Sequence, residues 1–242
     1  MKIIAIGGGE IGRPGFPIET EKIDRRIIRL SGKIHPRLLF IPTASSDSEG
    51  YVRVIKNYFG KRLGCRVSTL FLLRKKISRA EIRRQITRTD IVYVGGGNTL
   101  AMMTRWRKFG VDVLLRKAAQ QGIVLAGVSA GAVCWFRQAN SDSRKFNNPH
   151  AGYIKVRGIG LIPALCCPHY NVERGRQAAL KKMMKKTPGV AIALDNCAAL
   201  EVVDGTYRII TSKPEASGYK VFWKKGKLHT QKIRNGEILE LK

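Results

Sequence analysis

Acidic residues are scarce in this sequence of 242 residues. The chain has 17 aspartates and glutamates against 45 lysines and arginines, which gives a formal net charge of +28. Such an excess of one sign attracts anionic molecules by its field alone. Nucleic acid must therefore be considered as a partner. The basic residues are spread along the whole chain without a recognisable nucleic-acid-binding module, so nucleic acid is a possible partner but not the favoured one.

Patterned cysteines and long apolar runs are missing as well. The five cysteines are odd in number and include no CxxC pair, which indicates neither a disulfide framework nor a zinc site. No stretch approaches the roughly 18 uncharged apolar residues that a membrane span requires. The first apolar run leads into glycines without a signal-peptide cleavage region. We therefore expect a cytoplasmic protein without metal, cofactor or membrane contact, either monomeric or a homodimer.

Short β-branched runs alternate with longer amphipathic stretches. Buried strands are predicted at Lys2–Ile6, Leu38–Ile41, Arg66–Phe71, Ile91–Val94 and Ile123–Gly127. Helical patterns between them cover Glu19–Leu30, Ser48–Leu63, Ser78–Thr87, Thr99–Phe109 and Val111–Gln121. This alternation predicts an α/β fold in which a parallel sheet is sandwiched between helices on both faces.

The remainder of the chain is richer in strand patterns. After Gly131 we expect a short helix and then a loop of Asn, Ser and Asp residues. One further helix is predicted at Val172–Lys186, and a β-rich C-terminal tail has strands near Ala191–Leu194, Ala199–Val203, Tyr207–Ile210 and Tyr219–Trp223. No repeat or shift in composition marks a boundary. A single domain over residues 1–242 is therefore predicted.

The most informative segment is a Gly-x-Ser-x-Gly turn centred on Ser129. The apolar run Ile123–Gly127 enters this turn, and an alanine-rich helix pattern follows it. The flanking glycines let the backbone turn sharply and hold the serine hydroxyl above the sheet. The N–H of Ala130, at the start of the helix, would point at an oxyanion. The context predicts a nucleophilic serine, whereas a capping serine in a tight turn is the structural alternative.

A second glycine turn, Gly95-Gly96-Gly97-Asn98, follows the strand Ile91–Val94. In a parallel sheet its edge would lie beside the edge that carries the serine. The N–H of Gly97 would then complete an oxyanion hole, and Asn98 would hydrogen-bond the substrate. The Lys-Ser/Thr pair of a phosphate-binding P-loop is missing.

A serine nucleophile needs a base, and the sequence has four histidines. His169 directly follows an apolar run, where a strand is expected to end at the same sheet edge. The other three lie in polar or lysine-rich connectors. Composition alone leaves His169 as a candidate and no more.

Three segments in this order resemble the peptidase E family, which is related to the cyanophycinases. They are Val94-Gly95-Gly96-Gly97-Asn98-Thr99, Gly127-Val128-Ser129-Ala130-Gly131-Ala132 and Pro168-His169-Tyr170-Asn171. The resemblance implies a sheet similar to class I glutamine amidotransferases, of flavodoxin-like type. It also implies a serine exopeptidase that releases N-terminal aspartate from small peptides, with Ser129 as nucleophile and His169 as base. Other amide or ester hydrolysis, as in cyanophycinases, remains the alternative, and a non-catalytic nucleic-acid-binding protein on this fold is an alternative of another class.

The third member of the triad follows less directly from the resemblance. The family has an aspartate in a polar segment after the nucleophile helix, which matches Asp142 in Asn140-Ser141-Asp142-Ser143. Asp195 and Glu201 are the alternatives. A Ser129, His169 and Asp142 triad is the prediction.

The glycine-rich start, Gly7-Gly8-Gly9-Glu10-Ile11-Gly12, has the G-x-G-x-x-G spacing of a dinucleotide fingerprint. A true fingerprint opens a helix at once, whereas Pro14 and Pro17 follow here. The second strand also lacks a following acidic residue for the ribose. We therefore predict a loop at the rim of the active site and no nicotinamide cofactor.

Overall fold

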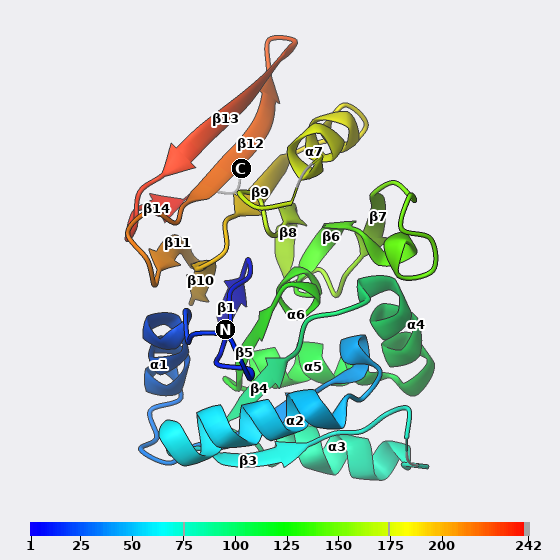
Figure 1. The fold of residues 1–242 in the computed structure, drawn as a ribbon, viewed down its shortest axis with the longest axis vertical. Helices are drawn as coiled ribbons and strands as arrows, with labels where there is room; N and C mark the ends of the chain where they lie inside the picture. Colours follow the sequence, from blue (N-terminus) through cyan, green and yellow to red (C-terminus); the bar gives the residue numbers. More distant parts are fainter. Residues whose placement is uncertain (75, 174, 240–242) are drawn as a thin grey trace.

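The computed structural model describes residues 1–74, 76–173 and 175–239. These residues form a mixed α/β fold with two multi-stranded sheets and seven α-helices (Figure 1). The parallel strands of the larger sheet lie in the lower half of Figure 1, and the second sheet lies above them.

The first sheet has eight strands. They are β1 (Lys2–Ile6), β2 (Arg37–Ile41), β3 (Arg66–Thr69), β4 (Ile91–Val94), β5 (Val124–Val128), β10 (Ala198–Val203), β11 (Thr206–Thr211) and β14 (Ile238–Leu239). Their order is β14-β11-β10-β1-β5-β4-β2-β3. The neighbouring strands β1, β5, β4, β2 and β3 run parallel to one another. On the other side of β1, strands β10, β11 and β14 extend the sheet by antiparallel pairing. In the flavodoxin-like order, 2-1-3-4-5, the first strand lies inside the sheet. Here β1 is the last of the parallel strands, between β5 and the antiparallel strand β10, so the order of the parallel strands differs from the flavodoxin-like one.

Seven α-helices surround the sheets. They are α1 (Glu21–Leu30), α2 (Glu49–Ile55), α3 (Arg79–Thr87), α4 (Thr99–Phe109), α5 (Val111–Gln120), α6 (Ala130–Val133) and α7 (Arg176–Met184). Two 3-10 turns (η1 Thr43–Ser45 and η3 Ser143–Phe146) and a π-helix (η2 Lys56–Arg62) complete the helical segments. Serine side chains cap two of these helices, because the hydroxyls of Ser48 and Ser78 accept the N–H of Tyr51 and Glu81.

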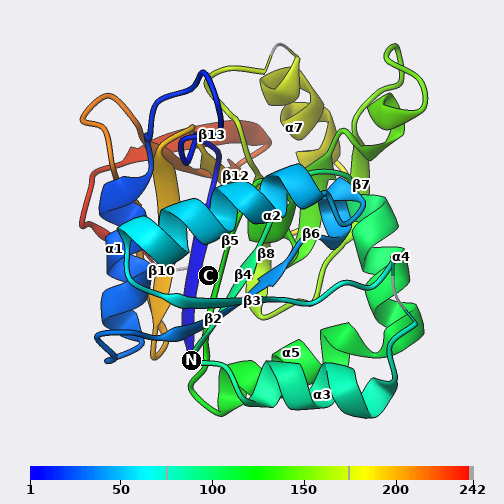
Figure 2. The same ribbon diagram turned by 60° about the horizontal axis from the view of Figure 1, so that its bottom comes forward.

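Side chains of the parallel strands alternate between two apolar clusters. Ile4, Leu38 and Tyr93 pack with α1, α2 and η2, whereas Ile3 and Leu39 pack with helices α3 to α6. Figure 2 shows α1 and α2 on one side of these strands and α3 and α5 on the other. The predicted sandwich of a parallel sheet between helices is thus present in this part of the chain.

The second sheet was not expected from the sequence. Its strands are β6 (Phe136–Ser141), β7 (Ile154–Arg157), β8 (Ile162–Cys167), β9 (Val190–Leu194), β12 (Gly218–Lys224) and β13 (Lys227–Ile233), in the order β13-β12-β9-β8-β6-β7. The segment that was expected to be a polar loop therefore begins as strand β6. The C-terminal strands do not form a separate tail, because β10, β11 and β14 extend the first sheet while β9, β12 and β13 extend the second.

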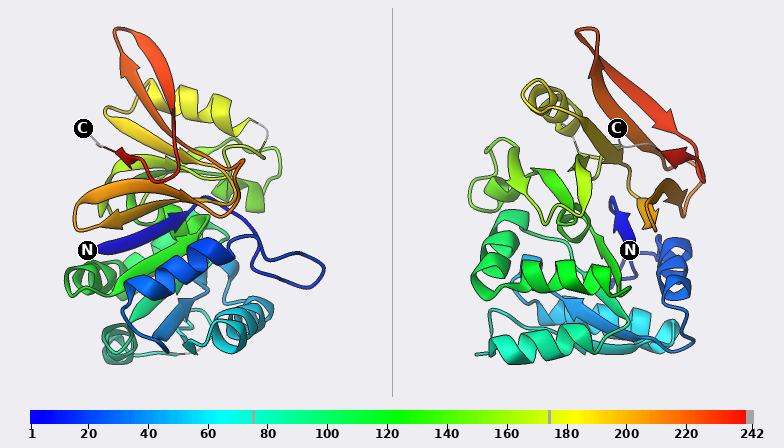
Figure 3. Two further views of the ribbon diagram at one scale, coloured as in Figure 1. Left: turned by 90° about the vertical axis from the view of Figure 1, so that its left-hand side faces the viewer. Right: turned by 180° about the vertical axis from the view of Figure 1, so that it is seen from behind.

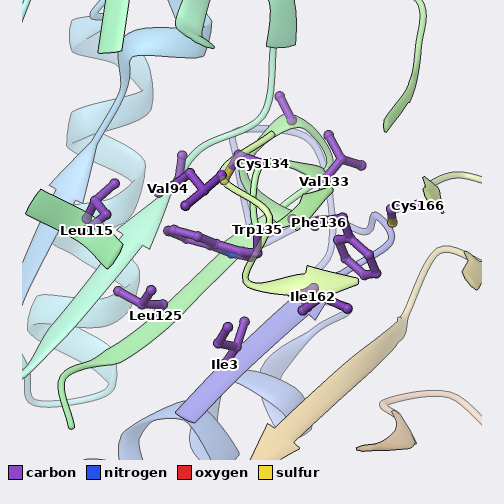
Figure 4. Packing of buried hydrophobic residues seen from close by; sticks show 14 of the residues in the cluster. Ile3, Val94, Leu115, Leu125, Val133, Cys134, Trp135, Phe136, Ile162 and Cys166 are labelled. Carbon is purple, nitrogen blue, oxygen red and sulfur yellow. The ribbon is translucent and has the colours of Figure 1, made fainter. Parts of the chain in front are cut away.

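One apolar cluster joins the two sheets. Ile3 and Leu125 of the first sheet pack in it with Phe136, Ile162 and Cys166 of the second (Figure 4). Further along the chain, β12 and β13 form a hairpin that projects from the body (Figure 3).

The predicted helix at Val172–Lys186 is shorter in the structure. Its first part falls in a turn, since the N–H groups of Val172 and Glu173 both donate to the carbonyl of His169. Residue 174 lies outside the described residues. Gly175 then takes a left-handed conformation before α7 begins at Arg176, which is why the helix cannot start earlier.

Candidate active site

Ser129 sits in a strained turn between β5 and α6. Its φ is 56° and its ψ is −114°, a conformation that costs a non-glycine residue about 1–3 kcal/mol. Its neighbours must be small. A Cβ on Gly127 would lie 2.4 Å from the Gly131 carbonyl oxygen, and one on Gly131 would lie 2.0 Å from that of Val94. The turn therefore has the geometry of a nucleophile elbow.

His169 reaches this serine from the other sheet. Its Nε2 lies 2.9 Å from Ser129 Oγ, within hydrogen-bond distance. The strand before it, β8, belongs to the second sheet, so the expectation that His169 ends a strand of the first sheet is wrong. The residue adopts a φ of 51°, and its N–H donates to the Gly7 carbonyl at 3.2 Å, which ties it to the end of β1.

The other imidazole nitrogen meets Asn196. Asn196 Oδ1 lies 2.7 Å from His169 Nδ1. An amide oxygen only accepts hydrogen bonds, so Nδ1 carries the proton and Nε2 is left to accept the Ser129 hydroxyl proton. The Asn196 backbone is itself held, because its N–H donates to Asn171 Oδ1 at 3.0 Å. These contacts hold the His169 imidazole in one orientation.

The predicted third group must therefore be corrected. Asp142 lies at the end of β6, with its carboxylate 3.9 Å from the Arg176 guanidinium, and it makes no contact with His169. Asp195 accepts the Ser217 N–H at 3.0 Å and the Tyr219 hydroxyl at 3.3 Å, and burial raises its pKa. Neither carboxylate is directed at the imidazole.

Glu201, the other alternative, lies buried in β10. It is paired with Arg26 and Arg208. Burial works against its ionised form, but the hydrogen bonds from the two arginines lower its pKa overall. This carboxylate stabilises the packing of α1 on the sheet and does not contact the site.

Gly8 lies directly against the His169–Asn196 contact. A Cβ at this position would be 2.0 Å from Asn196 Oδ1 and 2.4 Å from His169 Nδ1. The same turn holds both segments, since Gly7 N–H donates to Ala198 O and Gly8 O accepts from Cys197 N–H, each at 2.8 Å. The glycines that imitate a dinucleotide fingerprint therefore make room for the base and its orienting amide.

The turn that carries one of the expected oxyanion donors lies next to Ser129. A Cβ on Gly96 would lie 3.8 Å from Ser129 Oγ, so this turn borders the nucleophile. The N–H of Gly96 donates to the Tyr51 hydroxyl at 3.4 Å. Within the described part of the chain, the N–H groups of Gly97 and Ala130 have no hydrogen-bond partner. Their role as oxyanion donors stays a prediction.

Asn98 has a different use from the predicted one. Its Oδ1 caps α4 by accepting the Ala101 N–H at 3.0 Å, and its Nδ2 donates to the Ser143 carbonyl at 3.2 Å. Both ends of the amide are therefore engaged in structure. The prediction that Asn98 binds substrate has no support in this geometry.

A cavity of about 990 Å³ opens beside Ser129, His169 and Asn196. Its walls come from the loop after Gly9, from α2 and η2, and from Ser129, His169 and Asn196. Several charged side chains line it. Arg13 and Arg62 are paired with Glu10 and Glu21, whereas Arg53 forms no ion pair with any described carboxylate.

A buried carboxyl group lies behind the cavity wall. Asp24 has no exposed surface, and its Oδ2 accepts the hydroxyls of Thr20 at 2.7 Å and of Tyr58 at 2.9 Å. Its Oδ1 is buried and has no hydrogen-bond partner among the described residues. Burial raises the pKa of Asp24 to about 7.

Sequence reasoning missed Asn196, Gly8 and Arg53. The signal for Asn196 is its place two residues after the strand Val190–Leu194, since His169 likewise stands two residues after the strand that ends at Cys167. Asn196 is an amide, whereas the serine triad pattern predicts a carboxylate as its third member. Gly8 was recognised as part of a rim loop but not as a neighbour of the base.

Two features bear on other classes of protein. No helix among residues 1–74, 76–173 and 175–239 is long and apolar enough to cross a membrane. The same residues contain no group of three or more His, Cys, Asp or Glu side chains that could hold a metal ion. All five cysteines are free and buried.

Known proteins are similar to this chain over nearly its whole length. The model of peptidase family S51 matches residues 3–210. The "Uncharacterized peptidase YgaJ" of Bacillus subtilis is 34% identical over 225 residues, 91% of each chain. "Peptidase E" of Streptomyces coelicolor is 26% identical over 55% of this chain and 51% of its own. A crystal structure of a peptidase from an acI-B1 Actinobacterium superimposes with a TM-score of 0.74 over 98% of this chain and 96% of its own, at 21% identity. From the family match and the B. subtilis relative together, it follows that the chain belongs to peptidase family S51.

Proposed function

We propose that this protein is a serine peptidase of the peptidase E type, with Ser129 as nucleophile, His169 as general base and Asn196 as the residue that positions the base. The observation that carries the proposal is the hydrogen-bonded chain from Ser129 Oγ through His169 to Asn196, with distances of 2.9 and 2.7 Å. This chain begins on a strained elbow, where serine is otherwise an unfavourable choice.

The reaction follows from the positions of these groups. Ser129 Oγ attacks the carbonyl carbon of the scissile amide while its proton passes to His169 Nε2. The N–H groups of Gly97 and Ala130 stabilise the oxyanion. The amide C–N bond then breaks as His169 returns the proton to the leaving amine, which gives an acyl-enzyme. Water activated by the same imidazole hydrolyses the ester and restores the serine.

An asparagine is a suitable third group for this task. Its oxygen fixes the tautomer in which Nε2 accepts the serine proton, which is the orienting part of the role that a carboxylate plays. Papain-like proteases use a histidine and asparagine in the same relation. Asn196 carries no charge, so the electrostatic support that a carboxylate gives to the protonated imidazole is missing.

The cavity favours small peptides as substrates. Its volume of about 990 Å³ falls within the range of small-molecule pockets, roughly 300–1,000 Å³. Arg53 supplies an unpaired guanidinium that is suited to a carboxylate. We therefore infer that acidic peptides, including those with N-terminal aspartate as in the best-known members of the family, are preferred over neutral ones.

The test is hydrolysis of a panel of dipeptides and chromogenic aminoacyl amides by the native protein and by Ser129→Ala. Ser68→Ala is the matched control, because Ser68 is exposed on β3, far from the elbow in sequence and in the sheet. A fluorophosphonate probe is added to each protein. We expect Ser129→Ala alone to lose both hydrolysis and labelling. Native turnover by Ser129→Ala would show that the nucleophile has been assigned wrongly.

A further inference from the structure

Two segments of the second sheet carry many basic residues and not one acidic residue. Residues 175–194 contain five lysines and arginines, and residues 216–236 contain six, without any aspartate or glutamate. The first segment includes α7, and the second is the β12–β13 hairpin that projects from the body in Figure 3. Arg176 of the first segment is buried and paired with Glu173, but the two segments contain no acidic residue of their own to offset the charge of their lysines.

The two segments form one surface. Leu180 and Met184 of α7 pack with Val221 of β12 in a common apolar cluster. A second cavity, of about 600 Å³, lies between Lys185 and Pro188 on one side and Phe222 on the other. None of its lining residues lines the cavity beside Ser129. We call this region, α7 with the hairpin Gly218–Ile233, the basic hairpin surface.

The lysines at the tip of the hairpin are available to a partner. Lys224, Lys225 and Lys227 are exposed, and none pairs with a carboxylate among the described residues. Other basic side chains are neutralised locally, as in the ion pairs of Arg37 with Asp90 and of Arg84 with Glu81. The exposed lysines of α7 and of the turn that follows it, at 181, 182, 185 and 186, are likewise without an ion pair in this part of the chain.

Aromatic rings lie among these lysines. The register of the hairpin places Phe222 opposite His229 and Lys224 opposite Lys227 on one face. The rings of Phe222 and His229 stack with centroids 5.5 Å apart and an interplanar angle of 16°. His229 is nevertheless exposed, so its ring can extend the stack to a further planar group.

We propose that the basic hairpin surface binds single-stranded nucleic acid, in addition to the peptidase site and independently of it. Lysines would contact the phosphates, and a base would stack on His229, which together are the two elements of sequence-tolerant single-strand binding. An anionic membrane would be a weaker fit. None of the exposed large apolar side chains of the described residues lies on the hairpin, and its tip consists of lysines and Gly226.

The test measures fluorescence anisotropy of a labelled oligo-dT of about 20 nucleotides with the full-length protein over a salt series. The variant is Lys224→Gln, Lys225→Gln and Lys227→Gln together. The matched control is Lys22→Gln, Lys108→Gln and Lys117→Gln, which removes the same charge from exposed lysines of α1, α4 and α5. Three lost phosphate contacts should lower the slope of log K against log salt by about 2 in the hairpin variant. The control should keep the native slope and an affinity within about twofold.

A second variant tests the stacking. His229→Ala should weaken binding of the oligonucleotide about tenfold, a typical loss for one stacked base. A duplex of the same length should bind the native protein more weakly than the single strand. All hairpin variants should hydrolyse peptides like the native protein, which separates this proposal from the peptidase assignment.

Equal losses in the two triple variants would overturn the proposal, since binding would then depend on net charge alone. Absence of binding at low salt would do the same. Preference for the duplex, or full affinity of His229→Ala, would refute the single-strand assignment. Hairpin-dependent binding to vesicles that contain about 30% phosphatidylserine, without oligonucleotide binding, would assign the surface to membranes instead.

Discussion

Replacing Gly8 by alanine perturbs the base without touching any reacting atom. The added Cβ would lie 2.0 Å from Asn196 Oδ1 and 2.4 Å from His169 Nδ1. Both contacts are with side-chain atoms, which can move, and Gly8 does not have the positive φ that would strain an alanine backbone. The variant should therefore fold, with the orienting contact broken.

The size of the effect follows from the distances. Real Cβ atoms essentially never come within 3.0 Å of such atoms, so Asn196 Oδ1 must retreat by at least about 1 Å. The imidazole must move by about half as much, so the contact between Oδ1 and Nδ1, now 2.7 Å long, is either displaced from Ser129 or broken. A misplacement of about 1 Å in a catalytic group costs on the order of 100-fold in rate. We expect kcat to fall by about that factor, with little change in KM.

The assay is steady-state hydrolysis of the best dipeptide of the panel, together with the rate of fluorophosphonate labelling and the melting temperature. Gly152→Ala is the control, because a Cβ there meets nothing within 4 Å. Both variants should melt within a few degrees of the native protein. If Gly8→Ala kept kcat within about threefold, the hydrogen bond between Asn196 and His169 would have no role in orienting the base.

Other predictions address the remaining groups. Ser129→Ala and His169→Ala should each lower kcat by several orders of magnitude. Because the two residues act as a unit, the double variant should be hardly slower than either single variant, and additive losses in kcat would contradict this. Arg53→Gln should reduce kcat/KM for an aspartyl dipeptide at least tenfold more than for an alanyl dipeptide, and equal losses for both substrates would exclude Arg53 from recognition. Added salt should likewise lower kcat/KM of the native protein more for the aspartyl dipeptide than for the alanyl one, while leaving kcat nearly unchanged. The folded-state pKa of Asp24, about 7 against 3.8 ordinarily, means that its contribution to stability is complete below about pH 4 and is lost as pH rises through 7. Asp24→Asn should therefore be more stable than the native protein at pH 8, by up to about 4 kcal/mol in urea titrations; this advantage should fall below half at pH 5 and disappear only below about pH 4, and equal stabilities at pH 8 would refute the shift.

The parallel strands and the elbow could be predicted because their signals are local. The strands Lys2–Ile6 and Ile91–Val94 and the helix Thr99–Phe109 have the predicted bounds, since apolar runs there end at glycine, proline or a capping residue. Ser129 needs two flanking glycines within five residues, which a sequence displays directly.

The second sheet could not be predicted in the same way. Strand β8 pairs in parallel with β6 on one side and with β9 on the other. In the sequence, α7 separates β8 from β9. Such pairing depends on contacts between distant segments and leaves no local pattern. The polar ending of β6, at Asn140 and Ser141, is buried in the structure although its composition is typical of a loop.

The third triad group was missed for a related reason. Asp142 was preferred because a carboxylate shortly after the nucleophile helix fitted the family pattern. Position in sequence says little about distance in space, and the turn after β6 leads Asp142 toward Arg176. Asn196 is nearly 70 residues from Ser129 in the sequence, but β9 ends close to β8, and this brings Asn196 to the imidazole.

The candidate site lies where the two sheets meet, and this junction is called the seam. Ser129 follows a strand of the first sheet, whereas His169 and Asn196 follow strands of the second. The seam is fixed near the site by backbone hydrogen bonds to a single turn, with Gly7 O accepting from His169 and Gly8 O from Cys197. A small opening of this seam would separate nucleophile and base while leaving each sheet intact. Catalysis should therefore be more sensitive than the fold to changes in the first glycine turn, because local opening requires less free energy than global unfolding.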